Sequence, residues 1–322
     1  MRRLAGDVHI PDPMDAPSIR WGIIGASGIA RTMCTAINSY TTSRVVAVAA
    51  REPSRAKAFA RDNDVERAVD SYEELVACDD VDAVYVSTIH PYHARCALMA
   101  LRAGKPVLVE KPFTPTIVEA KELFALAKSK GLTVTPYQNR RFDSCFLTAK
   151  KAIESGKLGE IVEIESHFDY YRPVAETQPG LPQDGSFYGL GVHTMDQIIS
   201  LFGRPDHVAY DIRSLRNKAN PDDTFEAQLF YGDLKAIVKT SHLVKIDYPK
   251  FIVHGKKGSF IKYGIDQQET SLKANIMPGE PGFAADDSVG VLEYVNDEGL
   301  TVREELKPET GDYGRVYDAL YD

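Results

Sequence analysis

The chain has 322 residues, of which 43% are hydrophobic and 26% charged, and its formal net charge is −8. This length and composition predict a globular protein of two domains or one large one. The acidic balance, with no basic stripe, argues against a nucleic-acid partner, and no apolar run is long enough to cross a membrane.

The cysteine pattern predicts a cytoplasmic protein without a metal site. The four cysteines form no CxxC pair and lie near no cluster of metal-ligating residues. Reduced, buried thiols are usual in the cytosol. Residues 1–18 contain several prolines but no apolar core of a signal peptide, so we expect a flexible N-terminal arm there.

Strand and helix signals alternate from Ile19 to about residue 140. The expected strands are Ile19–Ile24, Arg44–Ala50, Val81–Ser87, Pro106–Val109 and Leu132–Thr135. The expected helices are Ile29–Tyr40, Ser54–Asp62, Ser71–Cys78, Tyr92–Ala103 and Thr116–Lys130. Such alternation predicts βαβ units, and therefore an α/β domain over residues 19–140 with a doubly wound parallel sheet of the Rossmann type.

The rhythm changes after residue 140, where strand signals dominate. The expected strands are Ile161–Phe168, Ala209–Ser214, Phe225–Phe230, Leu234–Thr240, Phe251–Val253 and Ser259–Lys262. Two helices are expected, at Phe146–Glu154 and His193–Phe202. This pattern predicts a second, α+β domain over residues 141–322, with a mostly antiparallel open sheet and helices on one face.

A glycine turn lies between the first expected strand and the first expected helix. Its sequence is Gly25-Ala26-Ser27-Gly28-Ile29-Ala30. Phosphate-binding turns need small residues here, because the backbone must approach a pyrophosphate that rests on the helix N-terminus. Glycine turns of this kind are common, but the strand before it and the helix after it favour cofactor binding by Gly25, Ser27, Gly28 and Ile29.

The end of the second expected strand bears on the choice of cofactor. NAD-binding domains place an acid there to bind the ribose hydroxyls, whereas this strand ends at Ala50-Arg51. Arg51, Ser54 and Arg55 could form a cationic cup for a 2′-phosphate. We therefore predict a preference for NADP(H), with NAD(H) as the other candidate. In the alternative interpretation, the two arginines are solvated charges at a helix start.

Glu110-Lys111-Pro112 follows the apolar run Val107–Val109. The carboxyl end of a buried strand is where an open α/β sheet binds ligands. Beside a dinucleotide turn, this placement predicts redox chemistry on a nicotinamide cofactor. Lys111 would then move the proton that accompanies hydride transfer. Without the other motifs, it would be read as a surface lysine after a strand.

Four motifs together resemble the Gfo/Idh/MocA family, named after glucose–fructose oxidoreductase, inositol dehydrogenase and MocA-like proteins. They are Gly25–Ala30, Ser87–His93, Ala103–Pro112, and Gly189–His193 with Asp196. The resemblance implies an NAD(P)-dependent oxidoreductase acting on a sugar or cyclitol carbon. It also implies that the second domain binds the substrate and forms a homodimer or homotetramer.

The resemblance also assigns roles to individual residues. Lys111 is similar to the family's catalytic lysine and His193 to its active-site histidine, here expected at a helix start. Glu110 would lie near the nicotinamide ribose, and Thr88 and His93 on the cofactor side. The residues expected to face the substrate are Asn139, Arg140, Tyr170, Tyr188 and Asp196. Tyr170 could equally be an ordinary strand-end residue.

Two departures from the family pattern keep alternatives open. Gly189 stands where many of these dehydrogenases carry an aspartate, and Asp184 or Tyr188 would have to substitute for it. The usual final helix is also expected to be missing. The alternatives are a reductase for a diol or keto compound and a non-catalytic protein that senses NAD(P).

Overall fold

The structure is a computed structural model that describes residues 17–314 and 316, with gaps at 176–179, 275 and 277–279. The chain divides into two compact units. The parallel-sheet unit holds the described residues up to Tyr137, and the mixed-sheet unit runs from Gln138 to Tyr313. The predicted arm lies almost wholly outside the described residues, as do residues 317–322.

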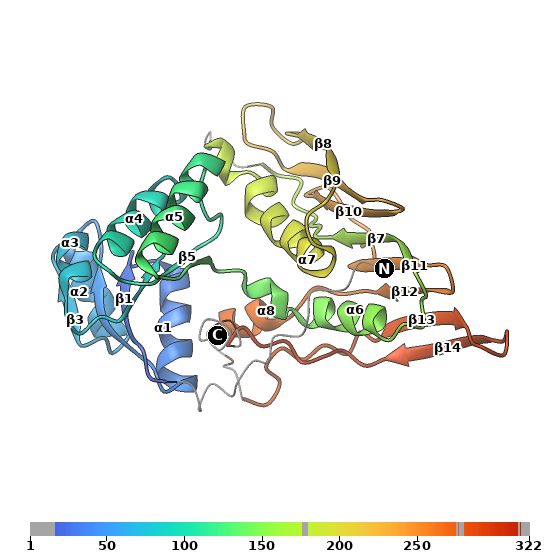
Figure 1. The fold of residues 1–322 in the computed structure, drawn as a ribbon, viewed down its shortest axis with the longest axis horizontal. Coiled ribbons are helices and arrows are strands. Elements are labelled where there is room, and N and C mark those ends of the chain that lie inside the picture. Colours follow the sequence, from blue (N-terminus) through green and yellow to red (C-terminus); the bar gives the residue numbers. More distant parts are fainter. Residues whose placement is uncertain (1–16, 176–179, 275, 277–279, 315, 317–322) are drawn as a thin grey trace. The chain divides into compact units, whose positions relative to one another are not determined.

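The parallel-sheet unit contains a six-stranded sheet in the order β3-β2-β1-β4-β5-β6 (Figure 1). The strands are β1 (Arg20–Ile24), β2 (Arg44–Ala49), β3 (Arg67–Val69), β4 (Ala83–Val86), β5 (Val107–Val109) and β6 (Val134–Pro136). The helices are α1 (Gly28–Tyr40), α2 (Pro53–Asp62), α3 (Tyr72–Ala77), α4 (His93–Arg102) and α5 (Ile117–Lys130). All neighbouring strands are parallel, so their carboxyl ends meet at one edge. The predicted Rossmann fold is confirmed.

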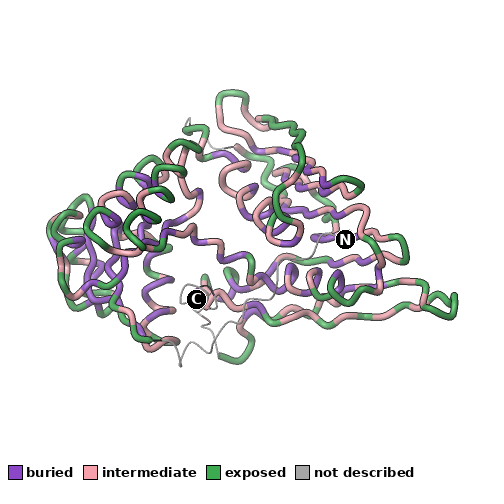
Figure 2. Tube along the Cα trace, viewed as in Figure 1, coloured by how far each residue is buried: buried purple, intermediate pink, exposed green. Residues whose placement is uncertain are grey.

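Local sequence explains these elements. β4 and β5 are buried along their whole length, as expected for strands covered by helices on both faces (Figure 2). Helix α1 begins at Ser27, whose hydroxyl accepts a hydrogen bond from the amide of Ala30. Helix α5 begins with a capping box of Thr116 and Glu119, and ends at Gly131 in the left-handed conformation.

The mixed-sheet unit contains an eight-stranded sheet in the order β14-β13-β12-β11-β7-β10-β9-β8. Only β7 and β10 pair in parallel, so the predicted, mostly antiparallel sheet is confirmed. The strands are β7 (Ile161–His167), β8 (His207–Arg213), β9 (Thr224–Tyr231), β10 (Leu234–Ser241), β11 (Phe251–Gly255), β12 (Gly258–Lys262), β13 (Gly290–Val295) and β14 (Thr301–Leu306). The helices are α6 (Ser144–Glu154), α7 (Val192–Phe202) and α8 (Gln268–Lys273).

Alternate residues of these strands form the core of the mixed-sheet unit. In β9, for example, Phe225, Ala227 and Leu229 are buried, and the residues between them are half-exposed. The buried set packs with residues of α6 and α7, such as Phe146 and Ile198, in one hydrophobic cluster. This explains why one side of the sheet is apolar and the other polar.

The helix that carries His193 starts earlier than we predicted. A π-helical turn, η4 (Phe187–Gly191), runs directly into α7. The first turn of this run is held by Asp222, whose carboxylate accepts a hydrogen bond from the amide of Phe187 at 2.7 Å. His193 therefore lies inside a helical run, and the expectation that it stands at a helix start is wrong. Its glycines made η4 resemble a loop.

Two further findings concern membranes and metals. Among the described helices, none is long and apolar enough to cross a membrane. Within the same part of the chain, no group of three or more histidine, cysteine or acidic residues could hold a metal ion. The four cysteines, Cys34, Cys78, Cys96 and Cys145, are free thiols.

Candidate active site

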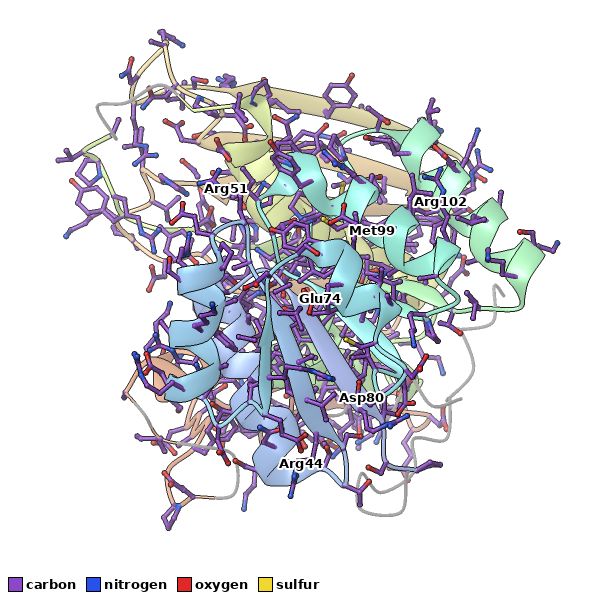
Figure 3. All side chains as sticks on the ribbon, turned by 90° about the vertical axis from the view of Figure 1, so that its left-hand side faces the viewer. Arg44, Arg51, Glu74, Asp80, Met99 and Arg102 are labelled. Atoms are coloured by element: carbon purple, nitrogen blue, oxygen red, sulfur yellow. The ribbon has the colours of Figure 1, made fainter. Side chains whose placement is uncertain are left out.

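The candidate site of the parallel-sheet unit lies at the carboxyl edge of its sheet. β1 has β2 on one side and β4 on the other, so the chain winds outward in opposite directions from this pair. Open α/β sheets bind ligands at such a switch point. Figure 3 labels Arg44 and Arg51, which mark the amino and carboxyl sides of β2. Arg51 is therefore on the ligand-binding edge.

The glycine turn is pressed against the end of β4. Gly25 has a φ of +110°, and a Cβ there would lie 2.8 Å from the backbone carbon and oxygen of Ser87. The Ser87 hydroxyl donates to the carbonyl of Gly25 at 2.7 Å, and the Ser27 hydroxyl lies 3.2 Å from that of Ser87. The amide of Gly25 also donates to Ala49 at the end of β2. Three strand ends are thus tied together at this turn.

The start of α1 has room for a phosphate. Gly28, its first residue, is exposed, and a Cβ added there would meet no atom within 4 Å. The amides of a helix N-terminus and its dipole favour a negatively charged group. A tight turn followed by open space over a 13-residue helix therefore fits the pyrophosphate of a dinucleotide.

The arginines after β2 differ in their contacts. The guanidinium of Arg55 donates to the carbonyl of Ala26 at 3.3 Å, so it reaches across the glycine turn from α2. Arg51 is exposed and pairs with Glu52 at 3.5 Å. Ser54 is exposed as well. All three residues follow β2, the strand after which Rossmann domains place the residue that binds the ribose.

Glu110 and Lys111 follow β5 directly. The Glu110 side chain is 5% exposed, and one carboxylate oxygen accepts a hydrogen bond from the hydroxyl of Tyr85 at 2.5 Å. Its other oxygen accepts the amide of Lys111 at 3.1 Å. Lys111 is half-buried, and its peptide bond to Pro112 is cis. The lysine side chain therefore starts from a backbone position that the neighbouring carboxylate holds.

His93 connects the loops that follow β4 and β5. It is 0% exposed, with one ring nitrogen 2.8 Å from the carbonyl oxygen of Pro112 and the other 3.0 Å from that of Thr88. Burial lowers the pKa of His93, although the two carbonyls oppose this effect. We expected His93 to bind the cofactor. In the structure, the His93 ring braces these two loops, with Thr88 half-exposed beside it, and cofactor binding by His93 stays a prediction.

The lowered pKa of His93 predicts how stability changes with pH. The folded protein resists protonating this ring more than the unfolded chain does, so His93 costs no stability above its unfolded pKa of about 6.5. As the pH falls below that value, the free energy of unfolding should drop by up to about 1.4 kcal/mol per pH unit. Urea unfolding at pH 7.5 and 5.5 should show a smaller acid loss for His93→Gln than for wild type.

The control for this experiment is His207→Gln, because His207 is exposed on β8. This variant should keep the pH dependence of the wild type. An equal acid loss in the wild type and in His93→Gln would contradict the prediction.

In the mixed-sheet unit, His193 is buried on α7, with 3% of its surface exposed. Gln197 lies one turn further along the same helix, 1% exposed, and donates to the carbonyl of Arg140 at 2.6 Å. This bond ties α7 to the short helix η2 (Asn139–Phe142), whose first residue is also buried. The structure thus brings the helix of His193 next to the segment with Asn139 and Arg140.

Arg140, which we expected to face the substrate, is only 6% exposed. Its guanidinium is buried and pairs with Asp143 and Glu269, at 3.4 and 2.5 Å, and lies over the ring of Phe168. Burial also raises the pKa of Asp143 to about 7. These contacts join Arg140 to other residues of the mixed-sheet unit.

The remaining expected substrate residues also have protein partners. Asp196 accepts two hydrogen bonds from Arg141, both at 2.7 Å, in a bidentate ion pair. Tyr170 packs edge-on against His242, with Arg172 3.9 Å from the centre of its ring. Tyr188 is half-buried in η4. A Cβ at Gly189 would meet nothing within 4 Å.

Comparison with known proteins identifies the family. Residues 19–138 match the model described as an oxidoreductase family with an NAD-binding Rossmann fold, and residues 150–322 match the C-terminal alpha/beta domain of that family. The chain belongs to the Gfo/Idh/MocA oxidoreductase family. The expected family is therefore confirmed. The expectation of an oxidoreductase with an NAD(P)-binding Rossmann domain is confirmed as well.

Individual members of the Gfo/Idh/MocA family are similar over most of the chain. The uncharacterized oxidoreductase YhhX of Escherichia coli (strain K12) is 88% identical over 77% of this chain and 72% of its own length. The scyllo-inositol 2-dehydrogenase (NADP(+)) IolW of Bacillus subtilis (strain 168) is 33% identical over 84% of this chain and 75% of its own. A crystal structure of a probable oxidoreductase yhhX has a TM-score of 0.87 and 74% identity, covering 94% of this chain and 88% of that one.

Sequence reasoning missed three buried residues whose side chains form hydrogen bonds to the segments described above. Tyr85 looked like one more apolar residue of a buried strand, although a buried tyrosine hydroxyl usually needs a partner. Ser87 was noted within a motif but not as the link to Gly25. Gln197 gave no signal in the sequence beyond its position four residues after His193.

Proposed function

We propose that this Gfo/Idh/MocA protein prefers NADP(H) and catalyses hydride transfer to or from a sugar or cyclitol carbon. The observation that carries the proposal is the carboxyl edge of the parallel sheet. There, the open start of α1 at Gly28 and the Glu110–Lys111 pair follow strands that lie close in one sheet. A phosphate cradle and a proton-transfer group are the two things that nicotinamide redox chemistry requires of the protein.

Each residue of this edge has a proposed task. The Gly25–Ile29 turn would bind the pyrophosphate, and Glu110 would accept a hydrogen bond from the nicotinamide ribose. When bound, the cofactor gives or takes the hydride. Lys111 would give or take a proton at the substrate oxygen, which changes between hydroxyl and carbonyl.

The preference for NADP(H) rests on the two arginines after β2. Arg55 is already directed at the glycine turn through its bond to Ala26, and Arg51 is exposed beside it. Guanidinium groups bind phosphate oxygens through paired hydrogen bonds. The relative IolW is named for NADP(+), which supports the same choice here.

The substrate residues are proposed from the family resemblance. His193 would orient the substrate hydroxyl or share its proton. Asn139, Tyr170 and Tyr188 are candidate contacts of the substrate. Arg140 and Asp196 are better described as residues that hold their own unit together, given their ion pairs. A homodimer or homotetramer and a cytoplasmic location stay predictions.

Initial rates with NADP+ and NAD+ test the proposal directly. The protein is mixed with a panel of inositols, aldoses and diols, and reduced cofactor is followed by absorbance. Turnover should occur with at least one polyol, with kcat/KM at least about tenfold higher for NADP+ than for NAD+. Arg55→Ala should lose most of this preference by weakening NADP+ alone, because a charged hydrogen bond is worth about 1.5–3 kcal/mol.

Lys57→Ala is the matched control, since Lys57 is an exposed cation on the same helix. It should keep the preference. Tight binding of NADP(H) without turnover on any substrate would favour a cofactor sensor. An unchanged preference in Arg55→Ala would contradict the proposed phosphate contact.

A further inference from the structure

Tyr85 is a tyrosine in the middle of an otherwise apolar buried strand. β4 has the sequence Ala-Val-Tyr-Val, and the side chain of Tyr85 is 0% exposed. A phenylalanine would give the same apolar packing without a polar atom that must find a partner. The role of this hydroxyl therefore depends on the group to which it donates a hydrogen bond.

The pairing of the strands directs this hydroxyl to Glu110. Tyr85 lies opposite Leu108 of the neighbouring β5, and Glu110 is two residues beyond Leu108. Because side chains alternate along a strand, Tyr85, Leu108 and Glu110 share one face of the sheet. The tyrosine ring spans the distance along that face, and its hydroxyl donates to the carboxylate at 2.5 Å.

A second aromatic ring packs against Tyr85. Tyr137, which follows β6, packs edge-on against it with ring centres 6.0 Å apart. The amide of Tyr137 donates to Val109, so this second ring is attached to the end of β5 as well. Tyr85 therefore has little freedom to move its hydroxyl away.

Fixing the Glu110 carboxylate also fixes Lys111. One oxygen is held by Tyr85 and the other accepts the amide of Lys111. Donors of this kind favour the charged carboxylate, which is otherwise costly to bury. A rotation of Glu110 would break its bond to the Lys111 amide and release the backbone from which the lysine side chain extends.

We infer that Tyr85 is a positioning residue: its hydroxyl locks the Glu110 carboxylate and, through it, the backbone of Lys111. This inference rests on the proposed function, because it gives Glu110 and Lys111 their tasks. It adds a residue in the interior of the sheet, with no direct access to a ligand, on which cofactor affinity and turnover both depend.

The test compares Tyr85→Phe with Tyr294→Phe in the full chain. Tyr294 is a matched control because its hydroxyl also donates to a glutamate, Glu304, at 2.9 Å, but in the β13–β14 hairpin. Calorimetric titration with NADP+ in the absence of substrate should show binding about tenfold weaker for Tyr85→Phe and unchanged for Tyr294→Phe. In the cofactor-free protein, acylation of Lys111, followed by mass spectrometry, should be faster in Tyr85→Phe.

Kinetics provide a second readout that general destabilisation would not reproduce. For Tyr85→Phe, kcat should fall about tenfold while KM for the substrate stays within about twofold. A double-mutant cycle with Glu110→Ala should show that the two losses do not add, because each variant removes one partner of the bond between Tyr85 and Glu110. If Tyr85→Phe does not fold, Glu110→Ala alone decides, and it should show the same increase in Lys111 acylation.

The outcomes separate this inference from the proposed function. If the wild type binds neither nicotinamide cofactor and turns over no substrate, the proposed function fails. If the wild type is active but Tyr85→Phe matches it in NADP+ affinity, Lys111 acylation and kcat, the positioning role is overturned and the proposed function stands. Additive losses in the cycle would also overturn it.

Discussion

Replacing Lys111 by methionine is expected to lower kcat about a hundredfold to ten-thousandfold. This is the range that a positioned acid or base contributes to proton transfer, and methionine keeps the length of the side chain without a proton to exchange. The half-buried position of Lys111 after β5 means that little packing should be lost. Turnover is measured with NADP+ and the best polyol of the panel, and cofactor affinity by calorimetry.

The pattern of kinetic constants distinguishes proton transfer from binding. A group that acts on the reacting oxygen mainly lowers kcat and kcat/KM together, whereas a group that only binds substrate raises KM. NADP+ affinity should stay within about threefold of wild type. In Lys111→Ala, added methylamine should restore part of the lost turnover, because a free amine can replace the missing one. Lys121→Ala, an exposed lysine on α5, should behave as wild type.

A Lys111→Met variant that retains more than about a tenth of the wild-type kcat would contradict the assignment. The proton would then be moved by another group, with His193 the next residue to test.

The order of strands and helices in the parallel-sheet unit followed from the sequence because its signals are local. Apolar runs such as Val107–Val109 mark buried strands, and caps such as Ser71 and Thr116 mark helix starts. The strand missed was β3, whose three residues Arg67-Ala68-Val69 show no period at all. It is a strand because it pairs with the edge of β2, which no local pattern reveals.

The mixed-sheet unit was harder to predict for the same reason. The β13–β14 hairpin was missed although its residues alternate in exposure and Gly299 closes its turn with a positive φ. Half of the residues in its outer strand, Thr-Val-Arg-Glu-Glu-Leu, are charged, so hydrophobicity gives little signal. The short helix α8 is another omission, since one or two turns are too short for a helical period.

The candidate site was predictable in its residue types but not in its contacts. Sequence identified the glycine turn and the Glu110–Lys111 pair, because each directly follows a strand that the sequence itself marks. It could not show that Asp196 is bonded to Arg141, or that His93 braces two loops, because these contacts join residues that are distant or on different elements. Burial and pairing decide whether a polar side chain serves the fold or a ligand.

Two glycine substitutions in one turn are expected to change the free energy of unfolding by very different amounts. Gly25→Ala should lower the free energy of unfolding by about 2–5 kcal/mol, because it forces a Cβ against the backbone of Ser87 at a φ of +110°. Gly28→Ala has neither a clash nor a positive φ, so it should stay within about 1 kcal/mol of wild type. Urea unfolding at pH 7.5 measures both.

Cofactor binding then separates the fold from the function of this turn. The space that is open above Gly28 is the space that the pyrophosphate would need, so a methyl group there should weaken NADP+ binding at least about tenfold in a fully folded protein. Ala30, already small and buried inside α1, gives the control Ala30→Gly, which changes stability but leaves that space open. If Gly28→Ala binds NADP+ as tightly as wild type does, the backbone at the start of α1 is not where the phosphates rest. The glycines would then serve the turn alone.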